Sequence, residues 1–248
     1  IALELGFASI SENSMDAVSD RDYLLEFMSD SALCMAHLSR LAEDLILWSS
    51  QEFGFVRMDD QYTTGSSIMP QKRNPDLAEL ARAKTGRVYG HLMSILTVLK
   101  GLPLTYNRDL QEDKEGLFDT VDTLHATLEA ISGMVSTMRV LSDATARAVD
   151  ESYILATDLA DYLVGRGVPF REAYRIVVGL SHYAQERGKF FGQLSMDEYH
   201  EFSDLFDDGV YRVTVESSLH ARNVYGGTSP KRVEMALHEA RGRLEAKQ

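Results

Sequence analysis

The chain has 248 residues, 44% of them apolar and 25% charged, which is ordinary for a folded protein with a substantial core. Its formal net charge of −13 argues against nucleic acid as a partner, because nucleic-acid-binding proteins present basic faces. No apolar run reaches the roughly 18 residues that a membrane-spanning helix needs, so we expect no membrane partner. The only cysteine, Cys34, excludes an intrachain disulfide, and we expect a buried thiol in a cytoplasmic protein.

The N-terminal part of the chain predicts one long helix from about Arg21 to Ser49. Because the chain begins at Ile1 without an initiator methionine, we expect it to come from the middle of something larger. Apolar or small residues alternate along the helix at spacings of four and three, a pattern typical of nearly parallel helix packing. This seam comprises Leu24, Met28, Ser31, Met35, Leu38, Ala42 and Leu45. A second stripe comprises Phe27, Cys34, Leu41 and Trp48. We expect burial against several helices, and self-association through the seam.

Two more long helices are predicted after a stretch rich in glycine and proline. We expect Asn74 to cap the second helix and Pro75 to occupy its first position. That helix ends at Gly101, where a Gly-Leu-Pro sequence stops it. A loop from Leu104 to about Lys114 leads into the third helix. Strand patterns are nearly absent.

Beyond residue 140 the pattern of long helices fades, and we place a domain boundary between residues 147 and 148. Residues 1–147 are expected to form part of a long-helix bundle, and residues 148–248 a small helical C-terminal domain. In the second domain we expect helices near 152–165, 170–187, 196–205, 210–220 and 230–246. The predicted fold class is therefore all-α, a long-helix bundle followed by a small all-α domain.

The residues with the most chemical content form the run Gly65-Ser66-Ser67-Ile68-Met69-Pro70-Gln71-Lys72-Arg73-Asn74-Pro75. The run places two hydroxyls, an ammonium and an amide before a helix N-terminus, which favours anions. Such a group suits a carboxylate whose negative charge grows during a reaction, with a serine beside Lys72 as the base. Composition alone favours an ordinary interhelical loop, which uses the same residue types.

The same eleven residues resemble the G-S-S-x-M-P-x-K-x-N-P motif of the fumarase/aspartase superfamily. The resemblance implies that Ser66 is the catalytic base, which takes a proton from the carbon next to a carboxylate. It implies that Lys72 and Asn74 hold that carboxylate and its aci-carboxylate form, and that Ser67 assists.

The resemblance also assigns a role to Glu79, which follows this run in the second helix. In the superfamily a glutamate at this position pairs with an active-site histidine. From the residues alone, Glu79 would be a solvated partner of Arg82. None of the seven histidines lies in a motif of the family, so we interpret all seven as structural or surface residues.

Further segments are similar to the argininosuccinate lyases and the related delta crystallins, and the likeness covers essentially the whole chain. Gln71 within the motif and the segment from Glu12 to Asp22 fit these families, and the family's substrate-contacting arginine matches Arg21. The run from Tyr106 to Glu115 fits them as well. Its substrate-contacting positions are Tyr106, Gln111 and Lys114.

Each of these substrate-contacting residues also has a simpler interpretation. Arg21 stands between two aspartates, where a solvated charge cluster is the default. Lys114 stands between Asp113 and Glu115 and could form a surface ion pair. Tyr106 could cover the edge of the core.

The resemblance implies a carbon–nitrogen lyase that splits argininosuccinate into L-arginine and fumarate by β-elimination. It implies a homotetramer whose active sites are shared between subunits, with a small-molecule substrate. We expect no metal and no other cofactor, because the sequence contains neither a metal-ligand cluster nor a nucleotide loop. The general acid is expected outside this chain, which alone would be incomplete and inactive. Two alternatives stay open: a structural protein of the delta-crystallin kind, and another fumarate-releasing lyase such as adenylosuccinate lyase.

Overall fold

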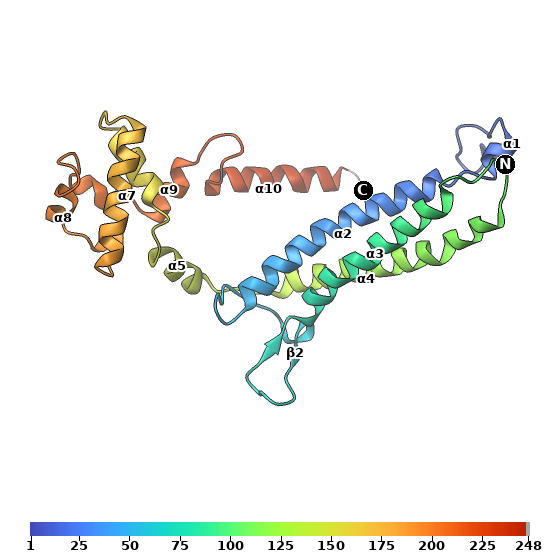
Figure 1. Cartoon of the computed structure of the whole chain (residues 1–248), viewed down its shortest axis with the longest axis horizontal. Coiled ribbons are helices and arrows are strands. Elements are labelled where there is room, and N and C mark those ends of the chain that lie inside the picture. Colours follow the sequence, from blue (N-terminus) through green and yellow to red (C-terminus); the bar gives the residue numbers. More distant parts are fainter. Residues whose placement is uncertain (247–248) are drawn as a thin grey trace. The chain divides into compact units, whose positions relative to one another are not determined.

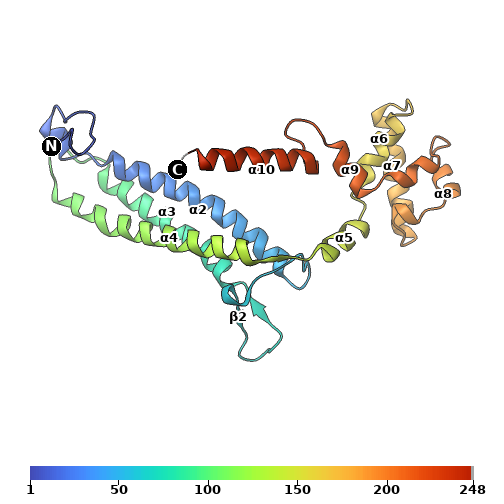
Figure 2. The same ribbon diagram turned by 180° about the vertical axis from the view of Figure 1, so that it is seen from behind.

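A computed structural model describes residues 1–246 and divides the chain into two compact units, Ile1–Ser142 and the residues from Asp143 onwards. The first unit is a bundle of three long helices, α2 (Asp22–Ser49), α3 (Asp76–Leu99) and α4 (Asp113–Thr137). They lie side by side, with α3 antiparallel to the other two (Figures 1 and 2). The second unit also consists of helices, so the all-α prediction is confirmed.

The alternating seam of α2 is the face that this helix buries against α3 and α4. All its residues are buried except Leu38, which is partly buried. The predicted buried face is therefore confirmed, whereas self-association through this seam is wrong, because the chain covers the seam itself. The second stripe is less covered: Phe27 and Trp48 are 40% and 39% exposed. Cys34, expected to be buried, is half-buried because it lies on this stripe.

Helix α4 turns threonines inward and apolar side chains outward. Its buried face includes Thr120, Thr123 and Thr127. The hydroxyl of Thr120 donates to the carbonyl of Gly116, and that of Thr127 to the carbonyl of Thr123, both at 2.7 Å. These bonds lie within the helix, so the hydroxyls of Thr120 and Thr127 need no partner from another helix. The exposed face carries an apolar stripe at helical spacing: Phe118, Val121, Leu128 and Val135.

Two short antiparallel strand pairs, of which the second is a hairpin, accompany the helices of the first unit. Strand β1 (Val56–Arg57) pairs with β4 (Arg139–Val140), and β2 (Thr64–Gly65) pairs with β3 (Arg73–Asn74). Asn74 is therefore part of a strand, and the expectation that it caps α3 is wrong. The N-cap is Pro75, which offers no side-chain acceptor, and the helix begins at Asp76. Three short elements complete the unit: α1 (Ser14–Ala17) and the 3-10 turns η1 (Asp60–Tyr62) and η2 (Arg108–Glu112).

The second unit contains six α-helices and two 3-10 turns within the described part of the chain. They are α5 (Ser142–Asp150), α6 (Ala156–Val164), α7 (Phe170–Glu186), η3 (Phe191–Gln193), α8 (Met196–His200), η4 (Asp208–Arg212), α9 (Val215–Ala221) and α10 (Pro230–Glu245). The boundary expected between residues 147 and 148 falls inside α5. The helix expected near 210–220 is divided between η4 and α9, because the Thr214 hydroxyl accepts from Ser217 N–H and starts a new helix.

The core of the second unit forms where α6 and α7 pack together. Leu163 and Leu180 are completely buried there, and Tyr199 and Phe206 close the cluster. A capping box starts α8, with the Ser195 side chain as its first member and Glu198 as its reciprocal partner. No helix within residues 1–246 is both long and apolar enough to cross a membrane.

Candidate functional site

Residues 66–72, here named the serine loop, form the turn between β2 and β3. The strands pair Thr64 with Asn74 and Gly65 with Arg73. The loop closes where the Ser66 N–H donates to the Lys72 carbonyl at 3.3 Å. Its tip projects away from the helices (Figure 1) and is exposed to solvent.

The hydroxyl of Ser66 is the acceptor for two backbone N–H groups inside the serine loop. Ile68 donates at 3.2 Å and Met69 at 3.1 Å. Hydrogen bonds to an oxygen favour its negatively charged form, so this arrangement favours an alkoxide at Ser66. The side chains of Ser67 and Lys72 are exposed, and neither forms a hydrogen bond with another residue that the structure describes.

Exposed side-chain contacts connect the β2–β3 hairpin, which carries the serine loop, to η1 and α3. The Thr64 hydroxyl donates to the Asp76 carboxylate in the first turn of α3. Arg73 forms an ion pair of 3.2 Å with Asp60, and both side chains are more than half exposed. Glu79 is exposed one turn further along α3. Arg82, considered above as its solvated partner, forms its ion pair with Glu43 of α2 instead.

A second group of functional candidates lies where α2 and α4 begin. Arg21 Nε donates to one oxygen of Asp113 at 2.6 Å, and Lys114 Nζ donates to the other at 2.8 Å. We call these three residues the cation cluster. The side chains of Arg21 and Asp113 are only 13% and 4% exposed, so the solvated cluster considered for Arg21 is not formed. Arg21 and Lys114 were both predicted as site residues, and the ion pair considered for Lys114 is formed with Asp113. The pairing of Asp113 with Arg21 was not predicted.

The charge of Asp113 is stabilised by its two cationic partners. Burial by itself would raise the pKa of this carboxyl group. The hydrogen bonds from Lys114 and Arg21, together with their positive charges, outweigh that effect and hold the pKa of Asp113 below its usual value. The carboxylate is therefore ionised at neutral pH and keeps both cations in place.

The loop between α3 and α4 carries the remaining predicted residues. Tyr106 and Gln111 are both exposed. Thr105 has a φ of 76°, which is strained for a β-branched residue, and its N–H donates to the Met15 carbonyl at 3.2 Å. Thr105 and Arg21 line one groove of about 390 Å³. Strained backbone concentrates at functional sites, which marks this loop as a candidate.

The structure does not bring all the predicted residues together within one chain. The serine loop precedes α3, and the cation cluster lies near the C-terminal end of the same helix (Figure 1). Helix α3 has 24 residues, which corresponds to a length of roughly 36 Å. The candidates therefore form two groups at opposite ends of the bundle: Ser66, Ser67, Lys72, Asn74 and Glu79 at one, and Arg21, Tyr106, Gln111 and Lys114 at the other.

One histidine of the bundle has an acidic partner. His91 Nε2 lies 2.6 Å from an Asp119 oxygen, and Arg87 binds the same carboxylate. The contact joins α3 to α4, away from the hairpin that carries the serine loop. No group of three or more histidine, cysteine, aspartate or glutamate side chains suited to a metal ion occurs in the described residues.

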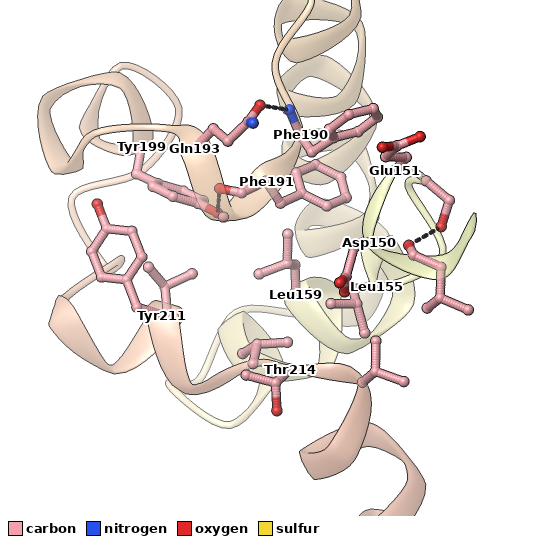
Figure 3. Close-up of a pocket in the computed structure, with 16 residues that line it drawn as sticks. Asp150, Glu151, Leu155, Leu159, Phe190, Phe191, Gln193, Tyr199, Tyr211 and Thr214 are labelled. Atoms are coloured by element: carbon pink, nitrogen blue, oxygen red, sulfur yellow. Dashed lines mark hydrogen bonds between the residues drawn. The ribbon is translucent and has the colours of Figure 1, made fainter. Parts of the chain in front are cut away.

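A separate pocket of about 420 Å³ lies within the second unit. Figure 3 shows its walls, with Phe191 and Leu159 on one side and Tyr211 and Thr214 on the other. The hydroxyls of Tyr199 and Tyr211 donate to the carbonyls of Phe191 and Leu194, both at 2.9 Å, so they support the wall. None of the predicted site residues lines this pocket.

Known proteins share this fold. The family model described as "Lyase" matches residues 1–90, and the model "Argininosuccinate lyase C-terminal" matches residues 153–220. A crystal structure of EDDS lyase in complex with formate superposes with a TM-score of 0.85 at 29% identity, covering 98% of this chain and 50% of that one. A class II fumarase from Schistosoma mansoni, at 21% identity, has the same fold with a TM-score of 0.63, covering 79% of this chain and 41% of that one. The fold and the family-model match thus place the chain among the lyases.

Curated relatives narrow the class further. An argininosuccinate lyase from Dehalococcoides mccartyi is 57% identical over 241 residues, 97% of this chain and 52% of the relative. Another from Symbiobacterium thermophilum is 56% identical over 237 residues, 95% of this chain and 51% of the relative. The chain belongs to the argininosuccinate lyase family. It spans about half the length of the curated relatives that it matches.

Proposed function

We propose that the protein of which this chain is a part splits argininosuccinate into L-arginine and fumarate. Identity of 54–57% to argininosuccinate lyases over nearly the whole chain is the observation that carries this proposal. The same proposal assigns the enzyme to arginine biosynthesis and to the cytoplasm.

In the proposed reaction, Ser66 removes a proton from the succinyl carbon next to a carboxylate. The electron pair left on that carbon moves into the carboxylate and gives an aci-carboxylate. This form then expels the guanidinium nitrogen, a C=C bond forms, and the nitrogen takes a proton from a general acid. The two N–H groups directed at Ser66 Oγ support the role of base, because they favour its charged form.

The growing negative charge of the aci-carboxylate is held by groups around the serine loop. Lys72 supplies a full positive charge, Asn74 an amide donor, and the N-terminus of α3 the positive end of a helix dipole. Ser67 assists from the same loop. Glu79 orients the general acid, which belongs to sequence that the longer relatives have and these 248 residues do not include.

The cation cluster holds the opposite side of the substrate in this proposal. Arg21 and Lys114 bind substrate carboxylates through charge-assisted hydrogen bonds, which are the strong ones. Tyr106 and Gln111 contact the substrate from the loop before α4. Arg21 remains able to bind because no hydrogen bond of its Nη2 to another described residue is present.

A site completed by several subunits follows from the separation of the two groups. One small substrate cannot contact both ends of a helix that is roughly 36 Å long. In a homotetramer with antiparallel neighbours, the serine loop of one subunit meets the cation cluster of another. The exposed apolar stripe of α4, with Phe118 and Leu128, supports this assembly, because large uncovered apolar surfaces mark interfaces.

Subunit complementation tests the proposal in the complete polypeptide. The unmodified enzyme is expected to release fumarate from argininosuccinate, and Ser66→Ala and Lys114→Ala variants are each expected to lose most of this activity. Refolding the two variants together creates mixed oligomers with some intact sites, so activity should return. A chain carrying both substitutions, refolded with unmodified chains in the same ratio, is the matched control. An unmodified enzyme that does not cleave argininosuccinate would overturn the function, and failure of complementation would overturn the shared site.

A further inference from the structure

Gly133 lies inside α4, although glycine is among the least favourable residues in a helix. The packing around it gives the reason. A Cβ at position 133 would lie 2.0 Å from Oη of Tyr62 and 2.4 Å from its Cζ, which is far closer than atoms can approach. The ring of Tyr62 therefore lies directly against the backbone of α4, and only glycine leaves room for it.

Tyr62 is the last residue of η1 and stands two positions before β2. Its ring packs against the core cluster that includes Ala78 of α3 and Met134 of α4. The η1 turn is ordered by Asp59, whose side chain accepts from the Gln61 N–H at 2.9 Å. A rigid ring on an ordered turn cannot move away from position 133 unless the turn moves or the ring leaves the core.

The other attachments of this hairpin are weak by comparison. The Asp60–Arg73 ion pair has side chains that are 64% and 52% exposed, and the bond from Thr64 to Asp76 is also exposed. Exposed pairs of this kind contribute little, because water and salt screen them. The contact between Tyr62 and Gly133 joins the segment just before β2 to the core cluster, in which Met58, four positions earlier, is also buried.

We infer that Tyr62 and Gly133 are positioning residues that fix the serine loop relative to α3 and α4. The inference rests on the function proposed above, in which Ser66 is the base. Tyr62 transmits the position of α4 to β2, and Ser66 directly follows β2. A displacement of about 1 Å at a reacting group can reduce a rate by about a hundredfold, so this contact governs turnover without touching the substrate.

A double-mutant cycle on thermal unfolding of the complete polypeptide tests the contact itself. Gly133→Ala is expected to lower the unfolding temperature while Tyr62 is present. In a Tyr62→Ala background the same change should leave the temperature unchanged or raise it, because only the helix preference of alanine then remains. Gly242→Ala, at a helical glycine with open space around it, is the control and should not lower the temperature in either background. Equal destabilisation by Gly133→Ala in both backgrounds would overturn the contact.

Hydrogen exchange and kinetics test the positioning role. Gly133→Ala should speed amide exchange in residues 63–75 while exchange in α2 stays as it was. It should also lower kcat by about a hundredfold and change KM by less than about threefold. Tyr62→Phe keeps the ring, and no hydrogen bond of the Tyr62 hydroxyl is present among the described residues, so this variant should behave as wild type.

Two results separate this inference from the proposed function. If wild type cleaves argininosuccinate and Gly133→Ala keeps kcat within about threefold, the positioning role is wrong. If wild type does not cleave it, the proposed function fails, and the exchange measurement still decides whether the contact fixes the loop. A uniform rise of exchange throughout the bundle would show a purely structural contact and overturn the inference.

Discussion

The two ends of the three-helix bundle hold their candidate residues in different ways. At one end the serine loop is exposed, and a surface ion pair between Asp60 and Arg73 lies at its base. At the other end the Arg21 and Asp113 side chains are mostly buried, and Arg21 Nε lies 2.6 Å from a carboxylate oxygen of Asp113. The side chains of the cation cluster are thus held in place without a bound substrate. The serine loop, by contrast, is exposed to solvent within the single chain. The proposed function therefore assigns proton abstraction and substrate recognition to opposite ends of the bundle of a single chain.

The largest effect is expected at the serine loop. In the complete enzyme, Ser66→Ala should lower kcat by about a hundredfold to ten-thousandfold, the usual contribution of a general base. Substrate binding should persist, because the cation cluster is intact at the other end. Steady-state release of fumarate and calorimetric binding of argininosuccinate check the two halves of this prediction. Retention of a tenth or more of the wild-type turnover would rule out Ser66 as the base.

The next effect is expected at Lys114. Lys114→Ala removes a charge-assisted hydrogen bond worth roughly 1.5–3 kcal/mol, so kcat/KM should fall by about tenfold to a hundredfold. Lys100→Ala, a change at a lysine outside both groups, is the control. If Lys114→Ala left kcat/KM unchanged, the proposed role of the cation cluster in substrate binding would be wrong.

Asp113→Asn should mainly affect stability, by about 2 kcal/mol, because it leaves Arg21 without its buried counter-charge. The folded-state pKa of Asp113 is lowered, so its contribution is present above the unfolded pKa and is lost as pH falls through the folded value. The stability difference between wild type and variant should therefore be full at pH 7 and shrink below about pH 4. Urea unfolding at a series of pH values measures it. A difference that stayed constant down to pH 2 would mean that folding does not lower the pKa of Asp113.

The smallest effect is expected at Arg73. Removing this exposed ion pair by Arg73→Ala should cost less than about 1 kcal/mol, and the cost should vanish at high salt. Thermal unfolding at low and high salt checks this. A loss as large as that of Asp113→Asn would show that the two ends are held with equal strength.

Much of the fold could be predicted because its information is local. The seam of α2 repeats every three or four residues, so Leu24, Met28 and Met35 could be assigned to one buried face from spacing alone. The same holds for the capping box at Ser195, which is contained within four residues. The Gly65–Pro75 run was found as a motif, and the structure shows it as a hairpin with an exposed turn.

What could not be predicted depends on contacts between distant segments. Asp113 pairs with Arg21 from 92 positions away, and nothing near either residue specifies the other. The role of Gly133 is visible only when Tyr62 lies against it. Asparagine is a common N-cap residue, so Asn74 was predicted to cap α3. In the structure Asn74 pairs with Thr64 in a strand and does not cap the helix. In each case tertiary structure overrode a local preference.

Thr105 has a consequence for any effort to raise the thermal stability of this protein. Its positive φ is the only such angle at a residue other than glycine among residues 1–246, and it costs on the order of 1–3 kcal/mol. A Thr105→Gly change would relieve that cost and would be an obvious choice for raising the unfolding temperature. The same change would relax the loop that leads from Tyr106 to the cation cluster, because glycine restricts the backbone less. A variant at this position with a higher unfolding temperature is therefore expected to have a lower kcat. The trade-off between stability and activity would then lie at one residue.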